Sequence, residues 1–134
     1  MFLIDSSAWI EFLRPKGSLK VKERIREILQ KDEGICCGII VVEVTRGAKT
    51  EGEFLQLKES LMALPQIPID GAVVDMASNW GFLLERKGRT VSTTDILIAA
   101  AAYGRARVIH LDKDFKQMSE VVGLEEEMIG SRGR

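Results

Sequence analysis

The sequence of 134 residues has little of what marks several protein classes. Its only cysteines, Cys36 and Cys37, are adjacent, a spacing that rarely satisfies disulfide geometry. The longest apolar stretch, 35–42, is too short to cross a bilayer, and the first residues lack the basic segment and long apolar run of a signal peptide. The sequence therefore excludes a disulfide-stapled mini-protein and a membrane span. We expect two buried thiols in a protein of the reducing cytoplasm.

An excess of charge of one sign is also absent. Lysine and arginine number 19, aspartate and glutamate 20, and the net charge is −1, which argues against a protein that grips nucleic acid by bulk positive charge. The charge is nevertheless uneven, since residues 86–116 carry seven basic and three acidic side chains. With 46% hydrophobic residues the chain is of globular composition. Its length predicts one domain, 1–134.

Short apolar runs alternate with helical stripes along the chain, which predicts an α/β fold with a parallel sheet covered on both faces. Buried strands are expected at 2–4, 35–37 and 107–110. Helices are expected to begin after Ser6 or Ser7, after Ser18, before 54–64, after Asp70, and after Thr93 or Thr94. Gly34 is expected to end the second helix. The helix 95–103 is rich in alanine, so it can lie close against its neighbours.

The pattern predicts the secondary structure of several segments less clearly. The β-branched run 39–42 favours a strand, but Glu43, Arg46 and Lys49 favour a helix with one polar face. We expect 67–69 to be a connector, 111–115 a turn, and 118–129 to contain some helix and one edge strand.

Acidic residues recur just past strands or near helix starts. Asp5 follows the first strand, where ligands bind in open parallel sheets; capping of the next helix is the alternative. Glu43 interrupts an apolar run, and a carboxylate buried there would need a charged partner or a cation. The alternative is that Glu43 faces solvent on a helix beside Arg46. Asp95 lies in the first turn of a helix. The helix dipole alone favours a carboxylate at that position.

Asp112 and Asp114 follow the strand 107–110 and also suit a plain turn. We expect one of them to face solvent, because alternate residues in an extended turn diverge. Carboxylates gathered at one sheet edge repel and raise each other's pKa, which a hard divalent cation relieves. Mg²⁺ and Mn²⁺ prefer oxygen ligands, lower the pKa of a bound water and neutralise a phosphoryl transition state.

Four segments in this order resemble the motifs of PIN-domain nucleases, and within them of the VapC-type toxins of prokaryotic toxin–antitoxin pairs. The segments are Leu3-Ile4-Asp5-Ser6-Ser7, Val42-Glu43-Val44-Thr45-Arg46-Gly47, Thr94-Asp95-Ile96-Leu97-Ile98-Ala99 and His110-Leu111-Asp112-Lys113-Asp114-Phe115. Each motif alone is loose, but four at these separations are specific and span nearly the whole chain. The resemblance implies a PIN-like fold, a three-layer α/β/α sandwich with a mostly parallel central sheet, and assigns 39–47 to a helix.

The resemblance also implies a site and an activity. Asp5, Glu43, Asp95 and Asp112 would be the catalytic, metal-binding carboxylates for one or two Mg²⁺ or Mn²⁺ ions, with Glu43 binding directly or through water. Ser7, His110 and Asp114 would be supporting residues. The implied reaction is metal-dependent hydrolysis of RNA by the toxin of a type II toxin–antitoxin system.

Partners follow from the same resemblance: RNA, a cognate VapB-type antitoxin and a second copy of the chain in a homodimer. Candidate contacts to RNA phosphates are Arg14, Lys87, Arg89 and Lys113. Trp9, Phe12 and Leu13 are candidates for lining an antitoxin groove, or belong to the core.

Three other functions stay open. A PIN nuclease could mature RNA without an antitoxin, and a PIN-like scaffold could bind RNA or a partner without cutting. A haloacid-dehalogenase-like phosphatase would need an aspartate where Ser7 stands.

Overall fold

The computed structural model describes residues 1–131, in which five strands form one parallel sheet of order β3-β2-β1-β4-β5. The strands are β1 (Phe2–Ile4), β2 (Gly34–Cys37), β3 (Gln66–Ile67), β4 (Arg107–His110) and β5 (Glu126–Met128). The helices are α1 (Ser6–Leu13), α2 (Leu19–Gln30), α3 (Gly38–Thr45), α4 (Glu51–Met62), α5 (Gly71–Arg86), α6 (Thr93–Ala102) and α7 (Lys113–Val122). None of these helices is long and apolar enough to cross a membrane.

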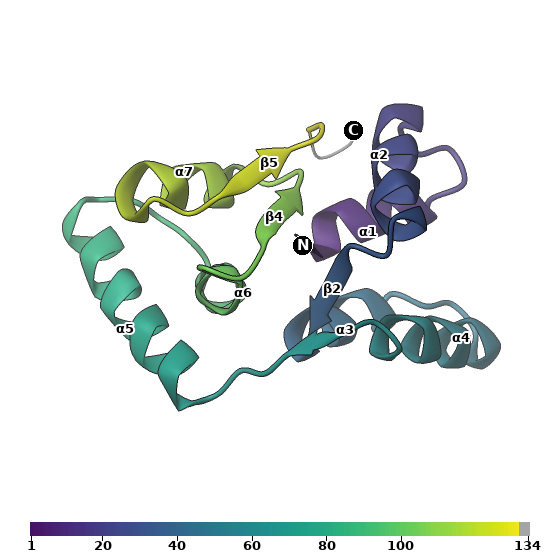
Figure 1. Ribbon diagram of the computed structural model, residues 1–134, viewed down its shortest axis with the longest axis horizontal. Coiled ribbons are helices and arrows are strands. Elements are labelled where there is room, and N and C mark those ends of the chain that lie inside the picture. Colours follow the sequence, from purple (N-terminus) through teal and green to yellow (C-terminus); the bar gives the residue numbers. More distant parts are fainter. Residues whose placement is uncertain (132–134) are drawn as a thin grey trace.

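The strand order places helices on both faces of the sheet. The chain first moves outward from β1 through β2 to β3, then returns to place β4 and β5 on the other side of β1. Right-handed crossovers therefore put α1–α4 on one face and α5–α7 on the other, as Figure 1 shows. The three-layer α/β/α architecture expected from the sequence is confirmed.

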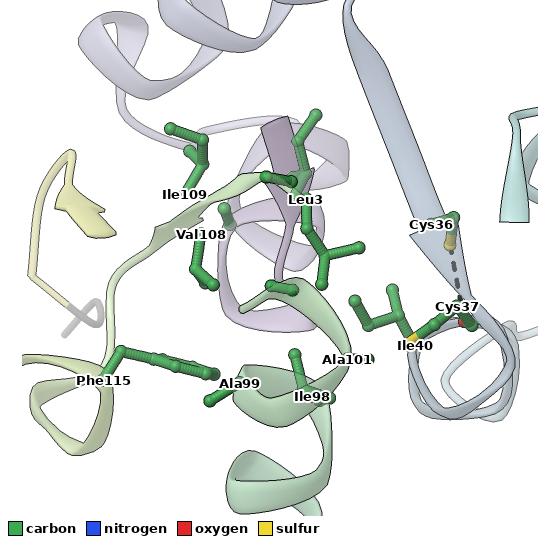
Figure 2. Packing of buried hydrophobic residues seen from close by; sticks show 14 of the residues in the cluster. Leu3, Cys36, Cys37, Ile40, Ile98, Ala99, Ala101, Val108, Ile109 and Phe115 are labelled. Atoms are coloured by element: carbon green, nitrogen blue, oxygen red, sulfur yellow. Dashed lines mark hydrogen bonds between the residues drawn. The ribbon is translucent and has the colours of Figure 1, made fainter. Parts of the chain in front are cut away.

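The core draws on helices of both layers, and one part of it lies between the central strands and α6. Leu3 and Val108 are fully buried in neighbouring strands, and Phe115 of α7 closes the layer (Figure 2). Small side chains at 99–102 let α6 lie close to the sheet, as its composition predicted. Cys36 and Cys37 are buried free thiols, also as predicted, and the Cys36 thiol donates to the Cys37 carbonyl over 3.6 Å.

Several helix boundaries differ from the sequence prediction. Asp5, not Ser6 or Ser7, caps α1, and Ser92, not Thr93 or Thr94, caps α6. Gly34 does not end α2, which stops at Gln30; it opens β2, where an added Cβ would meet the Leu29 side chain at 3.2 Å.

Two connectors were also wrongly predicted. Gln66–Ile67 is a strand, because β2 offers it a parallel partner that no local pattern reveals. The expected turn at 111–115 contains the start of α7, since Asp112 caps that helix. The segment 39–45 is helical, as the family resemblance implied and β-propensity did not. The edge strand expected within 118–129 is β5.

The three candidate groove residues of α1 have different environments. Trp9 is buried and belongs to the core, which was one of the two alternatives that the sequence left open. Its ring meets the half-buried Phe12 edge-on, with centroids 5.7 Å apart. Leu13 is exposed. Only the end of α1 thus offers apolar surface from this set.

Candidate functional site

The carboxyl ends of β1 and β4 form the switch point of the sheet. The chain leaves β1 toward α1 on one face, and it leaves the adjacent β4 toward α7 on the other. Diverging connections open a crevice at such a point, which is where open α/β sheets bind ligands. Asp5 follows β1 and Asp112 follows β4, so both carboxylates lie at this edge.

Asp5 is almost fully buried, with 2% of its surface exposed. Its Oδ2 accepts from the Ser7 backbone N–H at 3.0 Å and from the Ser7 hydroxyl at 2.6 Å. Oδ1 is buried and has no hydrogen-bond partner among residues 1–131. Burial raises the pKa of Asp5 more than the Ser7 hydrogen bonds lower it, and the charge of Asp112 raises it further. An unpartnered buried carboxylate oxygen is unfavourable unless a cation or proton binds it.

Ser7 forms hydrogen bonds to residues at the ends of both central strands, β1 and β4. While it donates to Asp5, its oxygen accepts the backbone N–H of Leu111 at 3.0 Å. One hydroxyl therefore fixes both the carboxylate after β1 and the backbone after β4. The supporting role that the family resemblance implies for Ser7 stays a prediction, and this hydrogen bond to Asp5 is the contact through which it would act.

Asp95, Asp112 and Asp114 come together, each offering a carboxylate oxygen within 4.8 Å of the others. Asp95 projects from the first turn of α6, while Asp112 and Asp114 lie at the start of α7. The expectation that Asp112 and Asp114 diverge is wrong. Asp112 Oδ1 accepts the Asp114 N–H at 3.0 Å and turns the chain into a helix, which brings both carboxylates to one side.

The proximity of these acids has a large electrostatic effect. Burial raises the pKa of Asp95 to about 8, with further contributions from Asp5, Asp112 and Asp114. The amino end of α6 favours the charged form by only about 0.3–1 kcal/mol. Burial and repulsion therefore outweigh the helix dipole, and at neutral pH this group retains a proton that a cation could displace.

Glu43 approaches the crevice from α3. The Ser6 hydroxyl donates to its Oε1 at 2.9 Å, so neighbouring serines hold Glu43 and Asp5. The charges of Asp5 and Glu43 both contribute to the raised pKa of Cys37, which is dominated by burial. Glu43 is thus held toward the sheet edge rather than being only a solvated helix residue.

His110 is fully buried at the end of β4. Its Nδ1 accepts the Asp112 N–H at 3.1 Å, and its Nε2 lies 2.6 Å from Glu126 Oε1. Both ring nitrogens are therefore occupied. His110 is arranged to support the Asp112 backbone and has no free nitrogen with which to take a proton from water.

The four candidate phosphate contacts are exposed or half-buried. Arg14 pairs with Glu11 at 2.7 Å and Arg89 with Glu120 at 2.8 Å. Lys113 is the first residue of α7, directly after Asp112. Lys87 follows the last turn of α5. Lys113 is consequently the basic residue placed nearest along the chain to the acidic cluster.

Sequence reasoning missed three supporting residues. Ser92 caps α6 by accepting the Asp95 N–H, and its own N–H donates to Asp114 Oδ2 at 3.2 Å. The spacing Ser92-x-x-Asp95 is a capping-box pattern that could have revealed it. Ser6 and Glu126 act on Glu43 and His110 across the fold, and no local pattern marks those contacts.

The chain is similar to several known proteins. Residues 2–121 match the family model described as PIN domain. The chain is 33% identical over 130 residues to "VapC ribonuclease Mb1587" of Mycobacterium bovis, covering 93% of this chain and 96% of that protein. It is 29% identical over 119 residues to "Ribonuclease VapC32" of Mycobacterium tuberculosis, covering 87% and 88%.

Solved structures share the fold. The DNA-bound VapBC of Salmonella typhimurium superposes with a TM-score of 0.76 at 20% identity, covering 95% of this chain and 96% of that one. The family-model match, residues 2–121, spans all four segments that carry the acidic residues. The chain therefore belongs to the PIN-domain family.

Proposed function

We propose that this protein is a divalent-metal-dependent ribonuclease that acts as the toxin of a type II toxin–antitoxin pair. One observation carries the proposal: the carboxylates of Asp95, Asp112 and Asp114 lie within 4.8 Å of one another. The charge of Asp5, whose buried Oδ1 has no hydrogen-bond partner among residues 1–131, acts on the same group through Asp95. The relatives named VapC ribonucleases give this site its reaction class. We propose that residues 1–134 form a single PIN domain, although 132–134 lie outside the described residues.

The donor set suits a hard cation. Asp5, Asp95, Asp112 and Asp114 offer only carboxylate oxygens, which match Mg²⁺ or Mn²⁺ rather than zinc. The one imidazole of the chain has both nitrogens engaged. A bound divalent cation would polarise the phosphodiester and lower the pKa of an attacking water.

The protein's own side chains provide positioning. Ser7 holds Asp5, Ser6 holds Glu43 and Ser92 holds Asp114, each through a hydrogen bond of 2.6–3.2 Å. We assign catalytic, cation-holding roles to Asp5, Glu43, Asp95 and Asp112, and add Asp114 to the ligand candidates because it shares the cluster.

RNA is the proposed substrate, since the relatives are named ribonucleases. Lys113 beside the cluster and the exposed Lys87 would contact phosphates, which would make binding fall with salt. Arg14 and Arg89 would have to leave their partners Glu11 and Glu120 to do so. Neutralising Lys113 should therefore weaken RNA binding more than neutralising Arg14.

A VapB-type antitoxin and a second copy of the chain are the proposed protein partners. The similar solved structures include VapBC complexes. On this chain, α1 packs on α3 and α3 on α4, and these adjacent helices expose the apolar side chains Ile10, Leu13, Val42, Leu55 and Met62. Such surface suits an antitoxin segment that covers the site. A dimer would cover apolar surface on α5, where Val74 and Phe82 are exposed.

The decisive test compares single aspartate variants in RNA cleavage with Mg²⁺, Mn²⁺ or EDTA. Asp5→Asn and Asp95→Asn should each lose cleavage by at least a hundredfold while keeping the wild-type circular dichroism spectrum. Asp75→Asn is the matched control, because Asp75 is an exposed aspartate of α5. Wild-type cleavage by Asp5→Asn would refute the site.

Calorimetric titration with Mn²⁺ separates a nuclease from an inactive scaffold. Binding at micromolar metal that disappears in Asp95→Asn supports the nuclease, whereas no binding below millimolar metal favours the scaffold. Co-purification of a small DNA-binding protein from the native operon would distinguish a toxin from an RNA-maturation enzyme.

A further inference from the structure

The only histidine of the chain has a defined place in the structure. His110 is 0% exposed, and its ring packs at 5.0 Å, centroid to centroid, against Phe115 of α7. A buried imidazole is unfavourable unless both nitrogens find partners. His110 finds them on two different elements.

The hydrogen bonds of His110 determine which nitrogen carries the proton. The backbone amide of Asp112 can only donate, so Nδ1, 3.1 Å away, must be an unprotonated acceptor. The ring proton is therefore on Nε2, which donates to Glu126 Oε1 at 2.6 Å. A carboxylate on the edge strand β5 thereby selects the ring form whose Nδ1 can accept.

This pairing fixes the backbone where it leaves the sheet. A side-chain acceptor that takes the N–H two residues later makes the same closed turn as an Asx or serine–threonine motif. The turn sets Asp112 in its helix-capping conformation, from which Oδ1 accepts the Asp114 N–H. The preceding amide, of Leu111, is held separately by Ser7.

We propose that Glu126 and His110 are positioning residues that act in sequence: Glu126 holds His110 in the Nε2–H form, and Nδ1 then orients Asp112 toward the cation. Metal affinity would thus depend on an edge strand that carries none of the proposed ligands. The metal part of this inference rests on the proposed function. The ring-form part does not, because it follows from the two hydrogen bonds alone.

The ring form can be measured directly in the wild-type protein. With one histidine in the chain, ¹⁵N-labelled protein gives a single pair of imidazole nitrogen signals. At neutral pH without metal we expect a protonated Nε2 and an unprotonated Nδ1. Replacing Glu126 by leucine should increase the other ring forms. A protonated Nδ1 in the wild type would overturn the proposal whether or not the protein cleaves RNA.

Variants of His110 separate positioning from packing. His110→Asn keeps a side-chain oxygen that can accept the Asp112 N–H, whereas His110→Leu does not, and both lose the ring that contacts Phe115. Thermal melts should fall for both. Mn²⁺ affinity should fall roughly tenfold or more for His110→Leu, the usual effect of losing a partner behind a ligand, and recover to within about threefold in His110→Asn.

The edge strand offers matched variants. Glu126→Gln keeps the acceptor oxygen and should bind Mn²⁺ like the wild type, while Glu126→Leu should lose affinity. Glu127→Gln is the control, since Glu127 pairs with Arg24 and not with His110. Wild-type Mn²⁺ affinity in folded His110→Leu, or equal losses in the Asn and Leu variants, would overturn the positioning role. If wild-type protein binds no Mn²⁺, the proposed function fails instead, and the ring-form measurement still decides this inference.

Discussion

The pKa of Asp95 predicts that the metal-free protein loses stability as pH rises through neutrality. Asp95 has a pKa of about 8 in the folded protein against a usual value of 3.8. A carboxyl group whose pKa is raised by folding binds its proton more tightly in the folded state. The free energy of unfolding therefore decreases as pH climbs from about 4 to about 8, and it levels off above that.

The size of the effect follows from this pKa. Where the folded protein holds the proton and the unfolded chain does not, each pH unit changes the free energy of unfolding by about 1.4 kcal/mol. The slope falls near pH 8, where the proton is half dissociated in the folded protein, so the total between pH 6 and pH 8 is about 2 kcal/mol. Asp95 is buried and titrates jointly with the neighbouring acids, which share part of this change, so we expect about 1–2 kcal/mol. Asp95→Asn removes the titrating group while preserving the shape. The free energy of unfolding of the variant, relative to that of the wild type, should therefore rise by this amount between pH 6 and pH 8.

Urea unfolding in EDTA, followed by the fluorescence of Trp9 and Trp80, measures this difference. Taking variant minus wild type at each pH cancels the titration of the groups that do not interact with Asp95, and leaves the joint titration of the acidic cluster. At pH 8, added Mn²⁺ should make the wild type more stable than Asp95→Asn, because a bound cation stabilises only the protein that binds it. Asp75→Asn should follow the wild type throughout. A variant-minus-wild-type difference that is equal at pH 6 and pH 8 would refute the assignment of a raised pKa to Asp95.

Three further outcomes are expected. Ser7→Ala should lower the urea-derived free energy of unfolding by about 1–3 kcal/mol, because the Leu111 N–H and Asp5 lose a buried partner; an unchanged value would contradict the bridging role. Gly17→Ala should lower the melting temperature, since its Cβ would lie 2.1 Å from the Glu11 carbonyl oxygen, while the control Gly52→Ala, with nothing within 4 Å, should not. Mn²⁺ binding at pH 7 should release protons, seen as a binding enthalpy that varies with the buffer's ionisation enthalpy, because the metal displaces the proton of Asp95.

Local pattern was sufficient for the strands β1, β2 and β4 and for most helices. The runs at 2–4 and 107–110 are strands because their apolar residues are buried in the sheet, although Arg107 at the start of the second run is exposed. Asp70 and Ser18 cap helices as their chemistry predicts. Local pattern failed where a distant partner decides the structure. Gln66–Ile67 becomes a strand only because β2 lies beside it.

The same division holds for the site. The sequence by itself determined which residue types carry the chemistry: carboxylates after β1 and β4 and at the start of α6, with a serine two residues beyond Asp5. Only the tertiary structure decided that Asp114 joins Asp95 and Asp112, that Trp9 is core, and that Glu126 orients His110. The physical reason is that spacing along the chain specifies the direction of side chains within one element. Contacts between side chains of different helices and strands depend instead on the strand order, which places the ends of β1 and β4 side by side.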